Sequence, residues 1–320
     1  MQTPSKATWL TRSAVIVSDV DGVHRMYSQL TQRFQWNVTD TTKSLEQAIE
    51  LVQTGGANLI IIDDSVTSPS GFHARALLNN TAALCTPILA LLLPQRSNES
   101  LLLNKCGFEV ATKPVTPAAF LPPFGELLQR WEKPSFATLR RLGYLLNRVT
   151  HDQLLGALFK LMEQEPIHSL CVQILALELR RIGNFKDAEQ ALLSSIKKDP
   201  KQDGRFLSLV DLYLHAAMPK LAHQLLTTLK NTNGISRLIA PDYVQSALMI
   251  GQLNTALECL GQLAKGANPD PTSIDFYARL LFSAGRDDEA EQLLAQSGRS
   301  FKKFQQKWLN ADSSGLPAAG

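Results

Sequence analysis

The chain has 320 residues, of which 44% are apolar and 19% are charged, so it can bury two modest hydrophobic cores. Its formal net charge of +3, without a basic stripe interleaved with aromatics, argues against a nucleic-acid partner. Four widely spaced cysteines lack a CxxC pattern, which argues against zinc. Apolar runs are too short for a signal peptide or a membrane span, so we expect a cytoplasmic protein with reduced thiols.

Residues 1–11 read as an N-terminal extension, and the region from there to residue 134 alternates short β-branched runs with helix-like segments. Strand-like runs occupy 14–17, 58–62 and 87–92. A capping box, Ser44 with Gln47, opens one helix, and two glycines at 55 and 56 close it. This alternation predicts an α/β fold of the flavodoxin-like type, with a five-stranded parallel sheet covered by helices on both faces.

Charged side chains follow three of the expected strands. Asp19 comes after the first strand, Asp63 ends the third and Lys113 follows the fifth, so all three should meet at the carboxyl edge of the sheet. The segments NLIIIDDSVTSPSGF, TPILALLL and ATKPVT resemble the receiver domain of bacterial response regulators over residues 12–132. The resemblance implies that Asp63 accepts a phosphoryl group, that Asp19 and Asp63 bind Mg²⁺, and that Lys113 neutralises the phosphoryl oxygens.

Three positions depart from the receiver pattern. Ser18 replaces the first of the usual two acids, Leu92 replaces the switch hydroxyl, and Val110 replaces the switch aromatic. Leucine cannot hydrogen-bond a phosphoryl oxygen, so we expect a pseudo-receiver with a weak or absent Mg²⁺ site and no required cofactor. The alternative is a working receiver in which a histidine kinase phosphorylates Asp63, with Mg²⁺, and thereby controls partner binding or homodimerisation.

A second alternative is a phosphatase of the haloacid dehalogenase type. The segment AVIVSDVDGVH resembles the first motif of that family, which implies Asp19 as the nucleophile and Asp21 as the acid/base. That family needs an acidic pair after the lysine, whereas here Asp63 and Asp64 precede Lys113. The order disfavours this alternative, and we expect no enzymatic activity. His73 and Arg75 follow Gly71, and we expect both side chains on an exposed helix face.

The C-terminal half repeats with a period of 34 residues. Small residues recur at two positions, the expected helix crossing (Ala188, Ala222, Ala256, Ala290) and the turn before it (Gly183, Ala217, Gly251, Gly285). This pattern predicts an all-α solenoid of stacked helical hairpins. Residues 169–302 resemble the tetratricopeptide repeat (TPR) family, best in GNFKDAEQALLSSIKKDP and AGRDDEAEQLLAQ. Residues 133–168 read as a linker and degenerate hairpin, 303–310 as the end of a capping helix with Phe301, Phe304 and Trp308 on one face, and 311–320 as a flexible tail.

The TPR resemblance also implies a concave groove. The side chains expected to face it are Gln173, Leu177, Arg180, Leu207, Asp211, Leu214, Gln245, Leu248, Asp275, Arg279 and Phe282. Their mixed character favours an amphipathic helix from a partner protein. The alternative is that the leucines pack against the chain's own receiver-like domain or capping helix. Together these features predict a non-enzymatic adaptor in bacterial two-component or related signalling that recruits a protein partner and contacts neither nucleic acid nor membrane.

Overall fold

The computed structural model describes residues 11–65, 67–68, 71–72, 74–164, 167–200, 203–264, 271–302 and 304–306. The chain divides into two units, Met1–Asp242 and Tyr243–Gly320. The first unit contains the sheet together with the first helical hairpins. The expected border near residue 132 therefore does not separate the two units, because the helices that follow it pack on the sheet domain.

Within the described residues, five strands of the first unit form one parallel sheet with the order β2-β1-β3-β6-β7. These strands are β1 (Ser13–Val17), β2 (Asn37–Thr42), β3 (Ile60–Asp63), β6 (Ile88–Leu92) and β7 (Glu109–Thr112). Every residue of β1, β3 and β6 is buried, as expected of central strands that helices cover on both faces. A short antiparallel pair, β4 (Thr67–Ser68) and β5 (Gly71–Phe72), follows β3.

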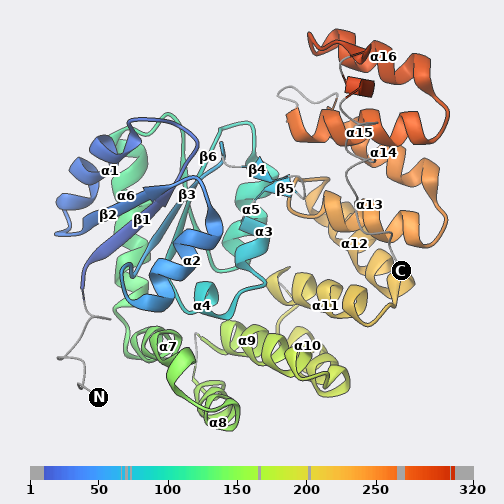
Figure 1. Cartoon of the computed structure of the whole chain (residues 1–320). Helices are drawn as coiled ribbons and strands as arrows, with labels where there is room; N and C mark the ends of the chain where they lie inside the picture. Colours follow the sequence, from blue (N-terminus) through green and yellow to red (C-terminus); the bar gives the residue numbers. More distant parts are fainter. Residues whose placement is uncertain are drawn as a thin grey trace. The chain divides into compact units, whose positions relative to one another are not determined.

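Helices cover both faces of this sheet. One face carries α1 (Val23–Gln32) and α6 (Pro117–Trp131), and the other carries α2 (Leu45–Thr54), α4 (Thr81–Leu84) and α5 (Ser97–Lys105) (Figure 1). The helix α3 (Ala74–Leu77) precedes α4. At the start of α2 only one of the two hydrogen bonds of the expected capping box is present. Ser44 Oγ accepts from the backbone N–H of Gln47, but Gln47 Oε1 accepts from Thr42 Oγ1 rather than from Ser44.

Helical hairpins follow the sheet domain. In the first unit they comprise α7 (Pro134–Leu145), η2 (Leu146–Arg148), α8 (His151–Leu161), α9 (His168–Arg181), α10 (Phe185–Lys198), α11 (Asp203–His215) and α12 (Pro219–Asn233). The crossing alanines Ala188 and Ala222 are fully buried. The turn residues Gly183 and Ala217 have φ values of 78° and 54°, so the turn demands the left-handed conformation.

The second unit repeats this hairpin geometry. It contains most of α13 (Ala240–Met249), then α14 (Leu253–Ala264), α15 (Pro271–Ser283) and α16 (Asp287–Gln296). The crossing alanines Ala256 and Ala290 are fully buried, and the turn glycines Gly251 and Gly285 have φ values of 79° and 70°. Helical hairpins with one register therefore occur in both units.

The end of the second unit is described only in part. The ring of Phe301 lies 6.1 Å from that of Phe282, measured between centroids, so this part of the expected capping segment contacts α15. Trp308, the tail 311–320 and residues 1–10 lie outside the described residues. No helix among those described is long and apolar enough to cross a bilayer.

Candidate functional site

The carboxyl edge of the sheet joins one lysine to two neighbouring carboxylates. Lys113 Nζ donates to Asp63 Oδ1 at 2.5 Å and to Asp64 Oδ1 at 2.5 Å. Asp63 and Asp64 are only 2% and 5% exposed. Burial acts to lower the pKa of Lys113, but its hydrogen bonds to the two carboxylates outweigh that effect and raise the pKa. The ammonium group is therefore held charged between two buried acids.

Asp63 has further donors around it. The backbone N–H of Ser65 donates to Oδ1 at 2.8 Å, and the Tyr27 hydroxyl donates to Oδ2 at 3.4 Å. Burial and the negative charge of Asp63 raise the pKa of Tyr27 well above its ordinary value, so Tyr27 stays a donor. The structure thus brings Asp63 and Lys113 together as placed by the sequence analysis.

Asp64 is a member of the site that the sequence analysis did not assign to it. Its Oδ2 accepts from the backbone N–H of Leu93 at 2.9 Å and lies 3.6 Å from Arg96 Nε. The available signal was the second acid immediately after a buried strand. A side chain at that position could point into the edge of the sheet or out to solvent, and the sequence does not distinguish the two.

Asp19 lies apart from this cluster of charges. Asp19 is exposed, and the neighbouring Asp21 side chain is 93% exposed with its Oδ1 3.3 Å from Lys43 Nζ. Ser18 is buried, and its hydroxyl accepts from the backbone N–H of Val20 at 3.1 Å. Among the residues that the structure describes, no group of three His, Cys, Asp or Glu side chains could hold a metal ion. Asp19 therefore does not join Asp63 and Asp64 in a ready Mg²⁺ site.

Of the two altered switch positions, Leu92 lies beside the cluster. Leu92 is 1% exposed and its carbonyl accepts from the backbone N–H of Lys113 at 2.8 Å. Val110, in β7, is half-buried. Neither side chain has a hydroxyl with which to follow a phosphoryl oxygen, as the sequence already requires.

The groove positions of the first two repeats are closed. Gln173, Leu177, Leu207 and Asp211 are 1%, 7%, 0% and 5% exposed. Arg75 of the sheet domain hydrogen-bonds the Leu207 carbonyl and Asp211, whereas the Gln173 side chain lies against Gly204 of α11, so the sheet domain closes part of this groove, as in the alternative that the sequence left open. These four positions are thus not a free partner surface in this arrangement. The remaining two groove positions of these repeats, Arg180 and Leu214, are half-buried.

Arg75 is the centre of this closure, and the expectation that it would be exposed is wrong. Arg75, from α3, is 8% exposed. Its Nη2 donates to Asp211 Oδ1 at 2.6 Å, to Asp242 Oδ2 at 2.9 Å and to the Leu207 carbonyl at 3.3 Å. One arginine of the sheet domain is therefore clamped by two acids of the repeats. His73 lies outside the described residues.

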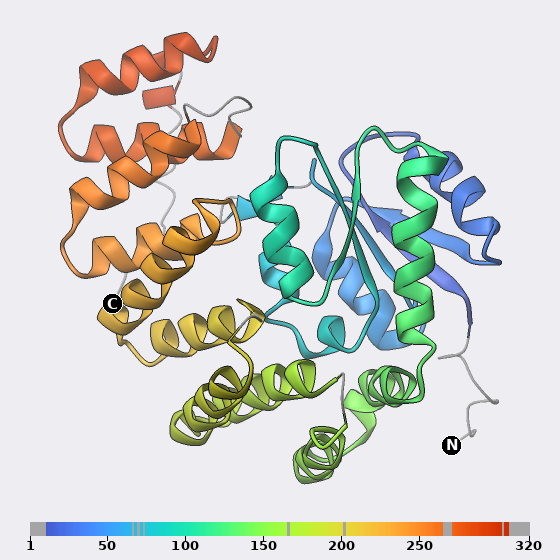
Figure 2. The same cartoon turned by 180° about the vertical axis from the view of Figure 1, so that it is seen from behind.

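Three more contacts extend the closure along α4 and α5. The Thr81 hydroxyl donates to Glu178 Oε1 at 2.8 Å, and Lys105 Nζ donates to Asn233 Oδ1 at 3.0 Å. Glu99 accepts three hydrogen bonds from the Arg237 guanidinium, two from Nε and one from Nη2. Both views of the chain show α9 and α11 alongside the end of the sheet domain that α4 and α5 form (Figure 2). We call this contact the docking interface.

The groove positions of the second unit are more open. Gln245 and Arg279 are exposed, and Leu248 is 37% exposed. Asp275 pairs with Arg299, and Phe282 is half-buried beside Phe301.

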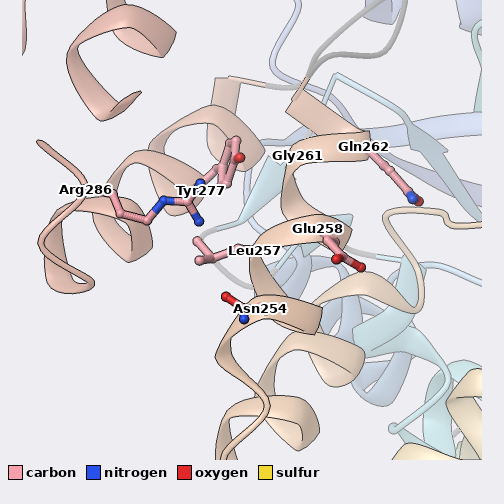
Figure 3. Close-up of a pocket in the computed structure, with 7 residues that line it drawn as sticks. All are labelled: Asn254, Leu257, Glu258, Gly261, Gln262, Tyr277 and Arg286. Atoms are coloured by element: carbon pink, nitrogen blue, oxygen red, sulfur yellow. The ribbon is translucent and has the colours of Figure 1, made fainter. Parts of the chain in front are cut away.

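The second unit also has an open hollow of about 630 Å³ that the sequence analysis missed. It is lined by Asn254, Leu257, Glu258, Gly261, Gln262, Tyr277 and Arg286 (Figure 3). Most of these residues belong to α14, at positions that the repeat does not direct into the groove. Gly261 makes room for the Tyr277 ring, because a Cβ there would lie 3.1 Å from the hydroxyl oxygen.

Comparison with known proteins yields a limited likeness. No protein-family model matches the chain, and no curated protein matches it. One solved structure, a thermophilic TPR protein of Thermus thermophilus, is similar at 18% identity with a TM-score of 0.36. The match covers 57% of this chain and 97% of that one. Its own elements define the described chain as an N-terminal five-stranded parallel sheet with its helices, followed by helical hairpins.

Proposed function

We propose that the chain is a non-enzymatic signalling adaptor that recruits a protein partner through its last helical repeats. The observation that carries this proposal is the difference in exposure between the groove positions. Leu177 and Asp211 are buried, Asp211 against Arg75 of the sheet domain, whereas Gln245, Leu248 and Arg279 remain accessible. An amphipathic helix, with apolar residues toward Leu248 and an acidic residue toward Arg279, fits this surface.

The test places a photo-crosslinking amino acid at position 279 of the full chain. A matched control carries it at position 193, because Leu193 is 46% exposed on α10 of the first unit. We expect a protein adduct from 279 that competes with unlabelled chain and is absent at 193. Equal adducts at both positions, or none at 279, would contradict the proposal.

We also propose that the N-terminal domain is a flavodoxin-like pseudo-receiver. The strand order β2-β1-β3-β6-β7 matches the order of that fold, and Asp63 with Lys113 at the carboxyl edge is consistent with receiver ancestry. The apolar Leu92 and a lysine already shared between two acids support loss of the phosphorylation switch, and with it no cofactor requirement.

One observation favours the alternative of a working receiver. Asp63 and Lys113 are in direct contact, as a phosphoryl acceptor and its neutralising cation must be. Intact-mass spectrometry after incubation with a small phosphodonor and Mg²⁺ separates the two, with Asp63→Asn as the control. We expect no adduct. A phosphoryl adduct that the substitution removes would favour a working receiver that receives its phosphoryl group from a histidine kinase.

A further inference from the structure

A line of buried and half-buried charged side chains leads from the carboxyl edge of the sheet to the docking interface. It begins with Lys113 between Asp63 and Asp64. Arg96 comes next, with its Nε 3.6 Å from Asp64 Oδ2 and its Nη1 3.5 Å from Glu99 Oε1. Asp64 and Glu99 side chains are 2% and 5% exposed, and that of Arg96 is 16% exposed. The acids of the line are therefore buried, and Lys113 and Arg96 are largely shielded from water.

The last link crosses from the sheet domain to the repeats. Arg237 Nε donates to Glu99 Oε1 at 2.9 Å and Nη2 donates to Oε2 at 2.8 Å, a paired geometry that fixes both side chains. The backbone N–H of Arg237 donates to Glu99 Oε1 at 3.1 Å, and its Nη1 donates to the Asp64 carbonyl at 3.4 Å. Arg237 lies between α12 and α13, so this link holds the repeats on α5.

The six side chains carry balanced formal charges. Asp63, Asp64 and Glu99 are negative, and Lys113, Arg96 and Arg237 are positive. Water screens little of the interaction between charges at these distances inside a protein, so removing one charge leaves its neighbours to rearrange. Lys113 would shift toward the remaining carboxylate. The balance of the Arg96 contacts with Asp64 and Glu99 would then change. Any such movement changes how Glu99 holds Arg237.

We propose that the charge held at Asp63 and Asp64 sets how firmly residues 236–242 dock on α5, and that Arg96 and Glu99 transmit the change. This goes beyond the proposed adaptor function, since it needs neither a partner nor a phosphoryl group. The coupling is reciprocal, so loosening Arg237 must in turn alter the surroundings of Lys113.

The test is a double-substitution cycle in the full chain, read out by hydrogen exchange of the backbone amides 236–242. Asp64→Asn should raise their opening constant about tenfold, and Arg237→Lys should raise it as well. The two effects should be non-additive when combined. Lys105→Met is the matched control, because Lys105 crosses the same interface to Asn233 outside the charged line. Its effect should add to that of Asp64→Asn.

A second readout guards against a variant that fails to fold. Glu99→Gln keeps the shape of the side chain and should also shift the Lys113 Nζ resonance of the folded protein, whereas Lys105→Met should not. Additivity in both cycles would overturn the proposal. So would an unchanged exchange rate at 236–242 in a folded Asp64→Asn chain, or an unmoved Lys113 resonance in Glu99→Gln.

Discussion

The inner-face positions of the repeats have opposite environments in the two units of the chain. Leu177 and Asp211 are 7% and 5% exposed, whereas Gln245 and Arg279, at the same repeat position, are exposed. The hairpins themselves do not differ, because the crossing alanines are fully buried in both units. The period therefore determines which side chains point inward. What occupies the groove depends on a neighbour that the period does not specify.

Removing the Arg75 side chain from its two acids should give the largest loss of stability. Arg75→Met leaves Asp211 and Asp242 without their shared cation, and loss of one partner from a buried ion pair costs about 3–5 kcal/mol. We expect the urea midpoint to fall accordingly. Arg279→Met, on the exposed surface, should change the free energy of unfolding by less than about 0.5 kcal/mol. Similar losses in both variants would remove the distinction between the closed and open groove.

In the Arg75→Met variant, the rate of thiol labelling should change in the first unit but not in the second. Burial raises the pKa of Cys171 to about 12, and burial followed by the nearby Cys171 and Glu178 raises that of Cys85. Both thiols should react slowly at pH 8 because little thiolate is present. Arg75→Met should speed the labelling of Cys85 and Cys171 but not of Cys259 in the second unit. Faster labelling of all three would indicate global unfolding instead.

A smaller loss of stability is expected where α7 packs against Cys85, the C-cap residue of α4. A Cβ added to Gly143 would overlap the Cβ of Cys85, so Gly143→Ala should cost about 1–3 kcal/mol in the free energy of unfolding. Gly156→Ala is the control in α8, where a Cβ meets nothing within 4 Å. It should stabilise the chain by about 0.5–1 kcal/mol, measured by urea denaturation. Equal effects would show that α7 does not pack this closely on the sheet domain.

A substitution in the turn at Ala217 should increase stability rather than reduce it. Ala217 has a φ of 54°, and glycines occupy the equivalent turns with φ between 70° and 79°. Ala217→Gly relieves the left-handed strain and should raise the thermal midpoint, by about 1 kcal/mol in stability. The reverse substitution, Gly251→Ala, should lower stability by about as much. A loss on Ala217→Gly would mean that its methyl group contributes more by packing than it costs in strain.

Local periodicity explains how much of the fold could be predicted. The strand runs, the recurring alanines and the turn residues determine the local structure of their immediate neighbours in the chain. The strands and the hairpins can therefore be predicted from the sequence. The docking interface does not. Arg75 lies 136 residues from Asp211 and 167 from Asp242, and each alone reads as a solvated charge. Burial of the three together creates the clamp, and one sequence contains no signal for that association.

The candidate site divides in the same way. Asp63 and Lys113 could be placed together because Asp63 ends one strand and Lys113 follows another strand of one parallel sheet, whose carboxyl ends share an edge. Asp19 follows a strand as well, but its side chain is exposed at that edge. Arg96 and Glu99 are spaced as helix-surface residues, and the pairing of Glu99 with Arg237 depends on a residue 138 positions away. The direction of a side chain after a strand, and its partner from a distant part of the chain, depend on tertiary packing.

The bond between Glu99 and Arg237 also has a consequence for synthesis. The two residues are 138 positions apart, and a ribosome adding about 5–20 residues per second needs roughly 7–28 seconds to make that stretch. The first part of this interval completes β7 and α6, and for the rest of it the sheet domain is fully made while the Glu99 carboxylate on α5 still lacks its distant arginine. Cells thus handle a half-finished protein whose docking face stays uncovered until the repeats emerge, and a chaperone would have its longest opportunity there.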